Sequence, residues 1–138
     1  MRPRGLIDTS ALVALVDASD HWHSACVDAA ASMEHPLATT TAVLAEFFHF
    51  RGQPLSYMQA AWRLVRSHSI KILPVEDSDL ADLERLMTKY ADTPMDFADA
   101  TLVRLAEREG LTTILTVDRD FEVYRIGGRK TFRVLPKR

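Results

Sequence analysis

The sequence predicts an α/β protein built on a central, mainly parallel sheet of four to five strands. Short apolar runs alternate with longer segments whose apolar residues recur at helical spacing, and parallel neighbours usually need a helical crossover between them. A chain of 138 residues fits one domain around one hydrophobic core. Hydrophobic residues make up 47% and charged residues 26%, with no repeat or linker-like segment, so we expect a single domain over residues 1–138.

The first half of the chain predicts two strands and four helices. Asp20 and a threonine, Thr40 or Thr41, can cap helices because their side-chain oxygens accept hydrogen bonds from the free N–H groups of a first turn. Pro36 and Pro54 stop helices, since proline lacks an N–H group. In chain order we expect a strand at residues 6–7, a helix at 11–16, a helix at 20–33, a strand at 37–39, a helix from 40 or 41 to about 52, and a helix from 56 to 65.

The second half predicts three strands and two helices. Leu80, Leu83 and Leu86 form the apolar stripe of the first of these helices. Gly110 ends the second, because glycine adopts the left-handed conformation common at helix ends. Gly127-Gly128 lacks the flanking pattern of a phosphate-binding loop, so it indicates a turn. In chain order we expect a strand at residues 70–75, a helix at 77–90, a helix at 97–109, a strand at 112–117 and a strand at 132–135.

Composition and charge limit the cellular setting and the partners. No segment approaches the roughly 18 to 20 apolar residues of a membrane helix, so we expect no membrane contact. Cys26 is the single cysteine, which excludes an internal disulfide and agrees with a cytoplasmic protein. The formal net charge is −2, but residues 125–138 hold six basic residues and no acid. Such a stretch suits a polyanion such as nucleic acid, although a solvated charged edge explains it almost as well.

Two aspartates occupy equivalent places at the ends of predicted strands. Asp8 and Asp118 each follow an apolar run and precede a turn into helix. Open α/β sheets bind ligands there, in the crevice beyond the carboxyl ends of the strands. Either aspartate could instead cap the helix that follows it, and the sequence leaves both interpretations open.

Three further acids are candidates for the same place. Glu46 lies inside the apolar run 42–48, where a carboxylate must be paired, bound to a metal or turned to solvent. An exposed glutamate on an amphipathic helix is the alternative. Asp96 is explained by capping the helix that follows it. Asp99 lies deeper in that helix, before an apolar stretch, and is the better candidate for chemistry.

A cluster of these acids would require a cation. Several carboxylates can converge only if a positive charge offsets their repulsion or if some stay protonated. A hard divalent ion such as Mg²⁺ prefers oxygen ligands and is typically held by one or two carboxylates directly. Such an ion activates water and stabilises charge on a phosphate under attack. The acids therefore indicate a site for a hard divalent ion such as Mg²⁺, of the kind used in phosphodiester cleavage.

Four strings follow one another along nearly the whole chain: IDTSAL at 7–12, TAVLAE at 41–46, DA at 99–100 and TVDRDF at 116–121. In order and spacing they resemble PIN domains, and most of all the short VapC-type toxins of bacterial toxin–antitoxin pairs. This resemblance implies a single PIN domain over residues 1–138 with a three-layer α/β/α fold. It also implies an acidic Mg²⁺ or Mn²⁺ site, endoribonuclease activity on RNA, a homodimer, and a cognate antitoxin that blocks the site.

The resemblance also assigns roles to positions of this sequence. The positions that match the acids of the family, and are expected to be catalytic and to hold the metal, are Asp8, Glu46, Asp99 and Asp118. Ser10 and Thr116 match hydroxyl positions that support such a site. Asp96 departs from the pattern, either as an added ligand or as a helix cap. The basic residues expected to hold the RNA backbone are Arg119, Arg125, Arg129 and Lys130.

Two other functions remain open. Asp8 could be the nucleophile of a haloacid-dehalogenase-like phosphatase, but position 10 is serine rather than a second aspartate, and no clear lysine motif follows. A PIN-like fold could also bind RNA or a protein partner without cutting. The completeness of the acidic set counts against that second alternative.

Overall fold

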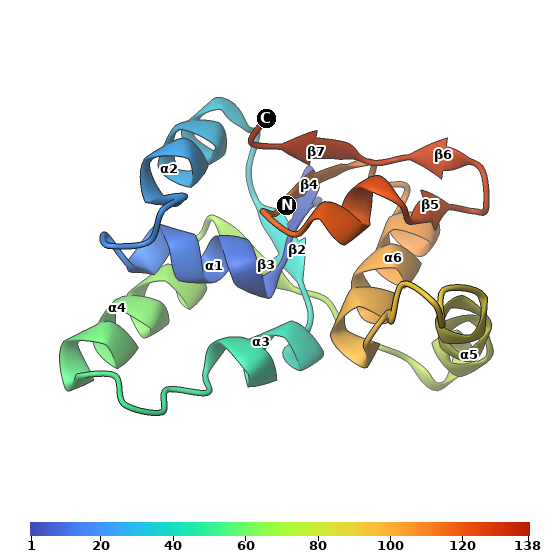
Figure 1. The fold of residues 1–138 in the computed structure, drawn as a ribbon, viewed down its shortest axis with the longest axis horizontal. Coiled ribbons are helices and arrows are strands. Elements are labelled where there is room, and N and C mark those ends of the chain that lie inside the picture. The colour runs from blue at the N-terminus through green and yellow to red at the C-terminus, as the bar shows by residue number, and fades with distance from the viewer.

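Five parallel strands form the centre of the molecule in the computed structural model, which describes residues 1–138 (Figure 1). The strands are β1 Gly5–Ile7, β2 Leu37–Thr39, β3 Ile70–Ile72, β4 Thr113–Leu115 and β7 Arg133–Leu135. Their order across the sheet is β3-β2-β1-β4-β7, and every neighbouring pair is parallel. The prediction of a mainly parallel sheet of four to five strands is therefore confirmed.

Helices cover both faces of this sheet, which gives the three layers of an α/β/α sandwich. The helices are α1 Thr9–Val16, α2 His23–Ser32, α3 Thr41–Phe47, α4 Leu55–Val65, α5 Leu80–Lys89 and α6 Phe97–Glu109. In Figure 1, α1, α2 and α4 lie on one side of the sheet and α5 and α6 on the other. The short helix α3 contacts both α1 and α6. The longest helix, α6, has 13 residues, and none has the length and apolar character needed to cross a bilayer.

The central strands are buried on both faces, as expected for parallel strands between two helical layers. Leu6 and Ile7 of β1 and Ile114 and Leu115 of β4 are fully buried. Leu6 lies opposite Ala38 of β2 on one side and Ile114 on the other. This burial explains why the strands are continuous apolar runs in the sequence rather than alternating ones.

The strand order places a topological switch between β1 and β4. From β1 the chain continues outward through β2 to β3, and it then crosses back to β4 and β7 on the other side of β1. The connections that follow β1 and β4 therefore part in opposite directions. Such a switch leaves a crevice at the carboxyl ends of the two strands, where open α/β sheets bind their ligands.

The helix α3 ends earlier than predicted, at Phe47 rather than near residue 52. Phe48 and Phe50 leave the helical path and pack edge to face, with ring centroids 5.2 Å apart. Aromatic pairs of this kind favour such geometry, and their burial outweighs the few hydrogen bonds that another helical turn would add.

The helix α2 and the strand β3 are also shorter than predicted. The Asp20 carboxylate accepts the N–H of Trp22 at 2.8 Å, in a turn that precedes the helix, and α2 starts at His23 without a side-chain cap. The strand β3 ends at Ile72. Pro74 follows two residues later, and proline has no N–H group for a sheet ladder.

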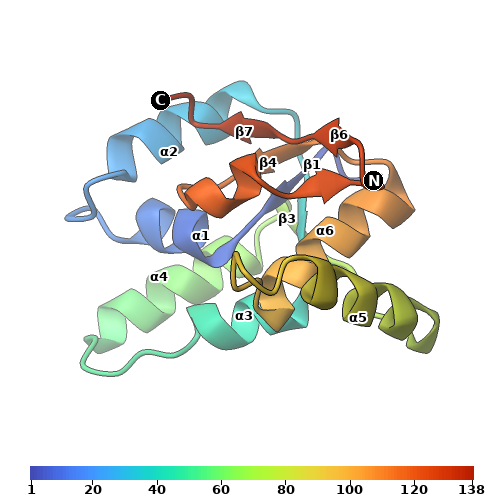
Figure 2. The same ribbon diagram turned by 45° about the vertical axis from the view of Figure 1, so that its right-hand side comes forward.

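Two 3-10 turns and a β-hairpin complete the fold: η1 Asp77–Asp79, η2 Arg119–Glu122, and the antiparallel pair β5 Arg125–Ile126 and β6 Lys130–Thr131. The hairpin was not predicted, but the turn at Gly127 and Gly128 is confirmed, with φ of 62° and 76°. Figure 2 shows this hairpin beside α6. The Gly127 N–H donates to Glu107 Oε2 at 3.1 Å, which ties the hairpin to that helix.

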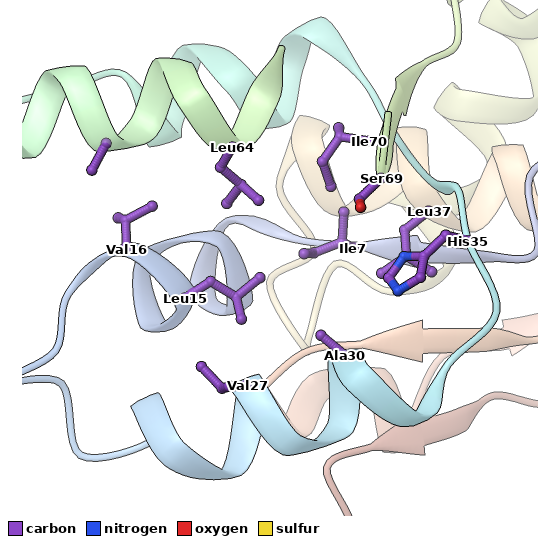
Figure 3. Close-up of a pocket in the computed structure, with 11 residues that line it drawn as sticks. Ile7, Leu15, Val16, Val27, Ala30, His35, Leu37, Leu64, Ser69 and Ile70 are labelled. Carbon is purple, nitrogen blue, oxygen red and sulfur yellow. The ribbon is translucent and has the colours of Figure 1, made fainter. Parts of the chain in front are cut away.

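An apolar hollow of about 380 Å³ lies between α2 and α4 (Figure 3). Val27 of α2, Leu15 of α1 and Leu64 of α4 contribute to its walls. Ile7, the last residue of β1, also lines it. The hollow therefore opens on the face opposite to α5 and α6, and it reaches the residue that precedes Asp8.

Candidate active site

Asp8 lies at the crevice between β1 and β4, directly after the last residue of β1. Its Oδ1 atom accepts the N–H of Ala11 at 3.1 Å and the hydroxyl of Ser10 at 2.7 Å. The bond from Ala11 caps α1, so the capping interpretation is correct. The side chain nevertheless stands at the predicted ligand-binding edge, and the two interpretations are compatible.

The environment of Asp8 opposes its negative charge. The residue is only 5% exposed, and burial raises the pKa of its carboxyl to about 6. Hydrogen bonds from Thr116, Ser10 and the Ala11 N–H act against this rise, and the charge of Asp118 adds to it. A buried, well-hydrogen-bonded carboxylate with a raised pKa is typical of functional sites.

Ser10 and Thr116 join the ends of the two strands. Their hydroxyl oxygens lie 3.3 Å apart, and the Thr116 hydroxyl donates to Asp8 Oδ2. Ser10 Oγ accepts the N–H of Val117 at 3.0 Å, and Thr116 Oγ1 accepts the N–H of Asp118 at 2.9 Å. The pair therefore fixes Asp8 relative to the loop that carries Asp118, whose side chain also caps η2.

The start of α6 brings two more acids to this edge. Asp96 caps the helix as predicted, since its Oδ1 atom accepts the N–H of Asp99 at 2.8 Å. The half-buried Asp99 accepts the hydroxyl of Tyr124 on Oδ2 at 3.2 Å. Burial, together with the charges of Asp96 and Asp118, raises the pKa of Asp99 to about 7.

Glu46 of α3 is exposed, but one of its carboxylate oxygens is bound at the start of α1. Thr9 Oγ1 donates to Glu46 Oε1 at 2.8 Å. Thr9 directly follows Asp8, so this bond holds Glu46 beside the crevice. Burial of its carboxyl group and the neighbouring charge of Asp96 raise the pKa of Glu46.

These five acids form one electrostatically coupled set. The charge of Asp118 raises the pKa of Asp8 and of Asp99. The charge of Asp96 does the same for Asp99 and Glu46. Side chains from the end of β1, from α3, from α6 and from the loop after β4 thus gather at one edge of the sheet.

The donor set fits a hard divalent cation. Carboxylate and hydroxyl oxygens are the ligands that such ions prefer. The raised pKa values of Asp8 and Asp99 show that burial and mutual repulsion penalise the negative charges, a penalty that a cation offsets. In their present rotamers the side chains form no ready group of three or more acid, histidine or cysteine ligands. Metal binding would therefore have to draw the carboxylates inward, and it stays a prediction.

The basic residues predicted to hold RNA differ in their surroundings. Arg119 is exposed on η2, directly after Asp118, and Arg129 and Lys130 are exposed on the hairpin. Arg125 instead donates from Nη1 to the backbone carbonyls of the three residues that precede it, so it holds the turn before β5. RNA binding by these four residues stays a prediction. Arg125 is the least available of them, because its guanidinium group already donates to three backbone carbonyls.

Two residues of the site, Thr9 and Tyr124, were not predicted. Thr9 lies between Asp8 and Ser10, so its place in a run of three consecutive polar residues could have marked it as a candidate for the site. Tyr124 has no such signal, because its contact with Asp99 depends on how the chain turns after β4.

Residues 5–127 match the family model of the PIN domain, and the chain belongs to the PIN-domain family. It is 32% identical to Ribonuclease VapC26 of Mycobacterium tuberculosis over an alignment 146 residues long, which covers 95% of this chain and 99% of that protein. The fold is similar to the crystal structure of Mycobacterium tuberculosis VapC20, a sarcin-ricin loop cleaving toxin, with a TM-score of 0.74 and 21% identity over 86% of this chain and 92% of that one. The family and the fold expected from the resemblance are confirmed.

Proposed function

We propose that this protein is an endoribonuclease that depends on Mg²⁺ or Mn²⁺ and acts as the toxin of a toxin–antitoxin pair. The observation that carries the proposal is the meeting, at the switch point of the sheet, of Asp8, Glu46, Asp99 and Asp118. Membership of the PIN-domain family and 32% identity to a ribonuclease support the class of reaction.

The four acids divide into an inner and an outer pair. Asp8 and Asp99 are the expected direct ligands, because burial raises their pKa values to about 6 and about 7, a penalty on the charged forms that a bound cation would offset. Glu46 and Asp118 complete the set, directly or through water. The bound ion supplies Lewis-acid chemistry, activating water and offsetting charge on the phosphate. Ser10 and Thr116 orient Asp8, since their hydroxyl groups donate to its Oδ1 and Oδ2 atoms respectively.

The RNA substrate requires positive charge beside these acids. Arg119 directly follows Asp118, so it is the basic residue expected beside the acids. Arg129 and Lys130 lie on the hairpin, which Glu107 binds at the opposite end of α6 from Asp99. Contacts of this kind hold phosphates without reading sequence. We expect the protein to act in the cytoplasm, where its substrate and its antitoxin are made.

A homodimer is the expected assembly. Ile72, Leu80 and Phe97 are large apolar side chains exposed on β3, α5 and α6. Phe97 and Val75 also line a hollow of about 480 Å³ that Glu46 and Asp96 border, so such an interface would adjoin the acidic site. Apolar surface of this kind supports an interface between two copies of the chain.

The cognate antitoxin is expected to occupy the apolar hollow of Figure 3. A hollow with apolar walls between two helices suits the apolar face of a third helix from a partner. Ile7 lines the hollow and is covalently followed by Asp8, so a partner bound there lies beside the catalytic edge. The acids themselves lie outside the hollow, so an antitoxin that blocks the site would also have to extend past its rim.

Asp8→Asn and Asp99→Asn test the proposal. Each change keeps the shape of the side chain and removes its charge, so cleavage of RNA in the presence of Mg²⁺ or Mn²⁺ should fall by more than about 100-fold, beyond what the loss of an outer-shell partner costs. Asp28→Asn, an exposed aspartate on α2, is the matched control and should cleave normally. Metal-dependent cleavage retained by both site variants, with folding unchanged by circular dichroism, would refute the assignment.

The two alternative functions have less support. A haloacid-dehalogenase-like phosphatase is not favoured, because the chain matches the PIN-domain family and Ser10 binds Asp8 where a second aspartate would be needed. A non-catalytic module would bind RNA but show neither metal uptake at the acids nor product. Titration with Mg²⁺ in the same assay separates that outcome from catalysis.

A further inference from the structure

Tyr124 is a fully buried tyrosine whose hydroxyl reaches the candidate site. Its side chain has no exposed surface, and it is among the largest fully buried side chains of the protein. The hydroxyl donates to Asp99 Oδ2 at 3.2 Å, and this is its one hydrogen bond. A buried tyrosine usually finds a partner for its O–H group, and here the partner is a carboxylate of the acidic set.

The ring of Tyr124 is held on two sides by other aromatic rings. Phe121 lies at a centroid distance of 5.1 Å and an angle of 84°, and Tyr90 at 5.1 Å and 67°. Phe121 is in turn packed against Phe132 at 5.7 Å. Close packing leaves such a ring little room to swing, so the phenol oxygen stands at a fixed point relative to α6.

Asp99 depends on this phenol more than Asp8 depends on any single donor. Asp8 accepts hydrogen bonds from the Ala11 N–H and from two hydroxyl groups. The Asp99 carboxylate accepts one, on Oδ2, and Oδ1 accepts none. The phenol therefore fixes the orientation of the carboxylate through Oδ2 and leaves Oδ1 without a hydrogen bond from the protein.

We propose that Tyr124 is a positioning residue, which holds one oxygen of Asp99 so that the other is presented to the catalytic cation. The inference rests on the proposed function, because it takes Asp99 as a metal ligand. Carboxylates that bind metals are generally hydrogen-bonded themselves, and loss of such an outer partner costs about 10-fold to 100-fold in metal affinity or activity.

Tyr124→Phe removes the phenol oxygen and keeps the ring and its packing. Binding of Mn²⁺ alone, measured by calorimetric titration of the RNA-free protein, should weaken by about 10-fold to 100-fold. RNA cleavage should fall at low Mn²⁺ and recover in large part as the Mn²⁺ concentration rises, because the defect lies in holding the ion. The melting temperature of the metal-free variant reports separately on the fold.

Tyr90→Phe is the matched control. Tyr90 lies in the same aromatic cluster and is also buried, but its hydroxyl accepts the N–H of Arg125 at 2.9 Å and does not contact Asp99. This variant should bind Mn²⁺ like the wild type even if its melting temperature falls. Unchanged Mn²⁺ affinity in Tyr124→Phe would overturn the inference, and so would equal losses in both variants, which would point to packing. A wild type that binds no Mn²⁺ and cuts no RNA would overturn the proposed function, and the inference with it.

Discussion

Two buried threonines, each at the carboxyl end of a strand, differ in what surrounds their hydroxyl groups. Thr116 follows β4, donates to Asp8 and accepts the N–H of Asp118. Thr39 ends β2, and its hydroxyl is buried without any hydrogen-bond partner in the protein. Both residues are fully buried. A buried polar group without a hydrogen-bond partner carries the full cost of losing its contacts with water. Replacing threonine by valine should therefore lower the free energy of unfolding at position 116, where partners are lost, but not at position 39, where the hydroxyl has none.

Thr116→Val should lower the free energy of unfolding by about 1.5–3 kcal/mol, because a charged acceptor and a backbone N–H both lose their partner. Thr39→Val should leave it unchanged or raise it by up to about 1 kcal/mol, because only an unpaired hydroxyl is removed. Urea unfolding at neutral pH measures both. Equal destabilisation by the two variants would contradict this account of the site.

At the scale of single residues, the sequence predicts what depends on position along the chain. Asp8 and Asp118 were identifiable because each follows the carboxyl end of a predicted strand, and open α/β sheets bind ligands in the crevice beyond those ends. Asp99 was identifiable because it stands too deep in its helix to be a cap. Tyr124 was not, since its bond to Asp99 spans 25 residues and arises only when the turn after β4 folds back onto α6.

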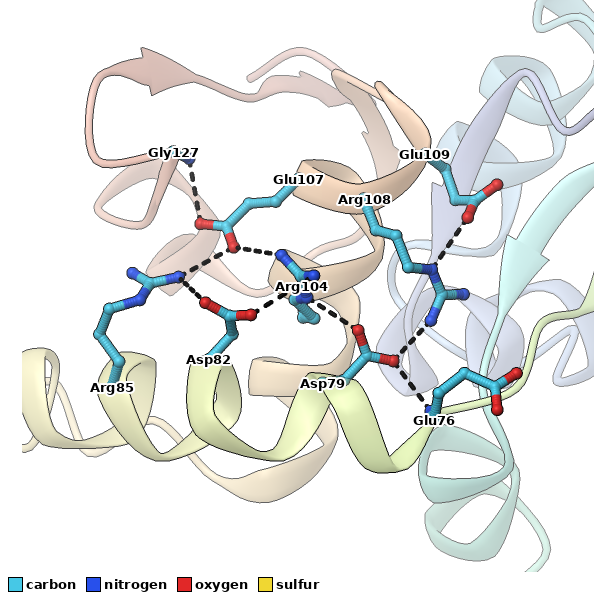
Figure 4. Close-up of polar contacts among 9 residues, drawn as sticks. All are labelled: Glu76, Asp79, Asp82, Arg85, Arg104, Glu107, Arg108, Glu109 and Gly127. Carbon is cyan, nitrogen blue, oxygen red and sulfur yellow. Dashed lines mark hydrogen bonds and ion pairs between the residues drawn. The ribbon is translucent and has the colours of Figure 1, made fainter.

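At the scale of elements, a network of ion pairs links η1 and α5 to α6, and the buried carboxylate of Asp79 is one of its members (Figure 4). Asp79, at the end of η1, is 1% exposed. Its carboxylate accepts hydrogen bonds from Arg104 Nε at 2.9 Å, from Arg108 Nη1 at 2.6 Å and from the Glu76 N–H at 2.9 Å. Burial raises the pKa of Asp79, but these hydrogen bonds and the two arginine charges outweigh burial and lower the pKa below its usual 3.8.

Asp79→Asn should lower the free energy of unfolding by about 3–5 kcal/mol at neutral pH, because it leaves two guanidinium groups beside a neutral side chain. The folded-state pKa of Asp79 is lowered, so its stabilisation is complete above the unfolded value of 3.8 and is lost as the pH falls through the folded value. The difference between wild type and variant should therefore begin to narrow below about pH 4 and go on narrowing as the pH falls through the lowered folded-state pKa. Unfolding curves collected from neutral to acidic pH measure it.

Asp82→Asn is the control for burial within the same network. Asp82 Oδ2 lies 3.4 Å from Arg104 Nη2, and Asp82 Oδ1 lies 3.4 Å from Arg85 Nη2, but the Asp82 side chain is 35% exposed. Exposed ion pairs contribute less than about 1 kcal/mol, so this variant should lose no more than that. If Asp82→Asn lowered the free energy of unfolding as much as Asp79→Asn, the difference in exposure would not explain how much each carboxylate contributes to stability.

Element boundaries were predictable where the signals are local. The helix α6 has the predicted bounds because Asp96 caps it and Gly110, with φ of 70°, ends it. The end of α3 was misplaced because Phe48 packs on Trp62, at a centroid distance of 4.5 Å, a partner that comes from α4. The hairpin was missed because strands of two residues leave almost no periodic pattern.

At the scale of the whole molecule, the candidate active site and the apolar hollow share one helix, α1. Asp8 caps the first turn of α1. Leu15 and Val16, at the other end of α1, line the hollow, and Ile7 lines it directly before Asp8. A partner in the hollow therefore contacts the elements that hold Asp8 in place, although the acids of the candidate site lie outside the hollow.

Val27→Asp should prevent neutralisation by the antitoxin without changing RNA cleavage by the free protein. Val27 is 41% exposed at the rim of the hollow, so the fold should tolerate the change. A carboxylate buried against an apolar helix lacks a partner, and the affinity should fall by more than about 100-fold. Ala31→Asp, exposed on the same helix but outside the lining, is the matched control and should be neutralised normally. Cell growth during co-expression with the antitoxin and direct titration of the purified pair measure the difference. If both variants are neutralised, the antitoxin binds another face of the protein, because burying the carboxylate of Val27→Asp against an apolar surface would weaken binding.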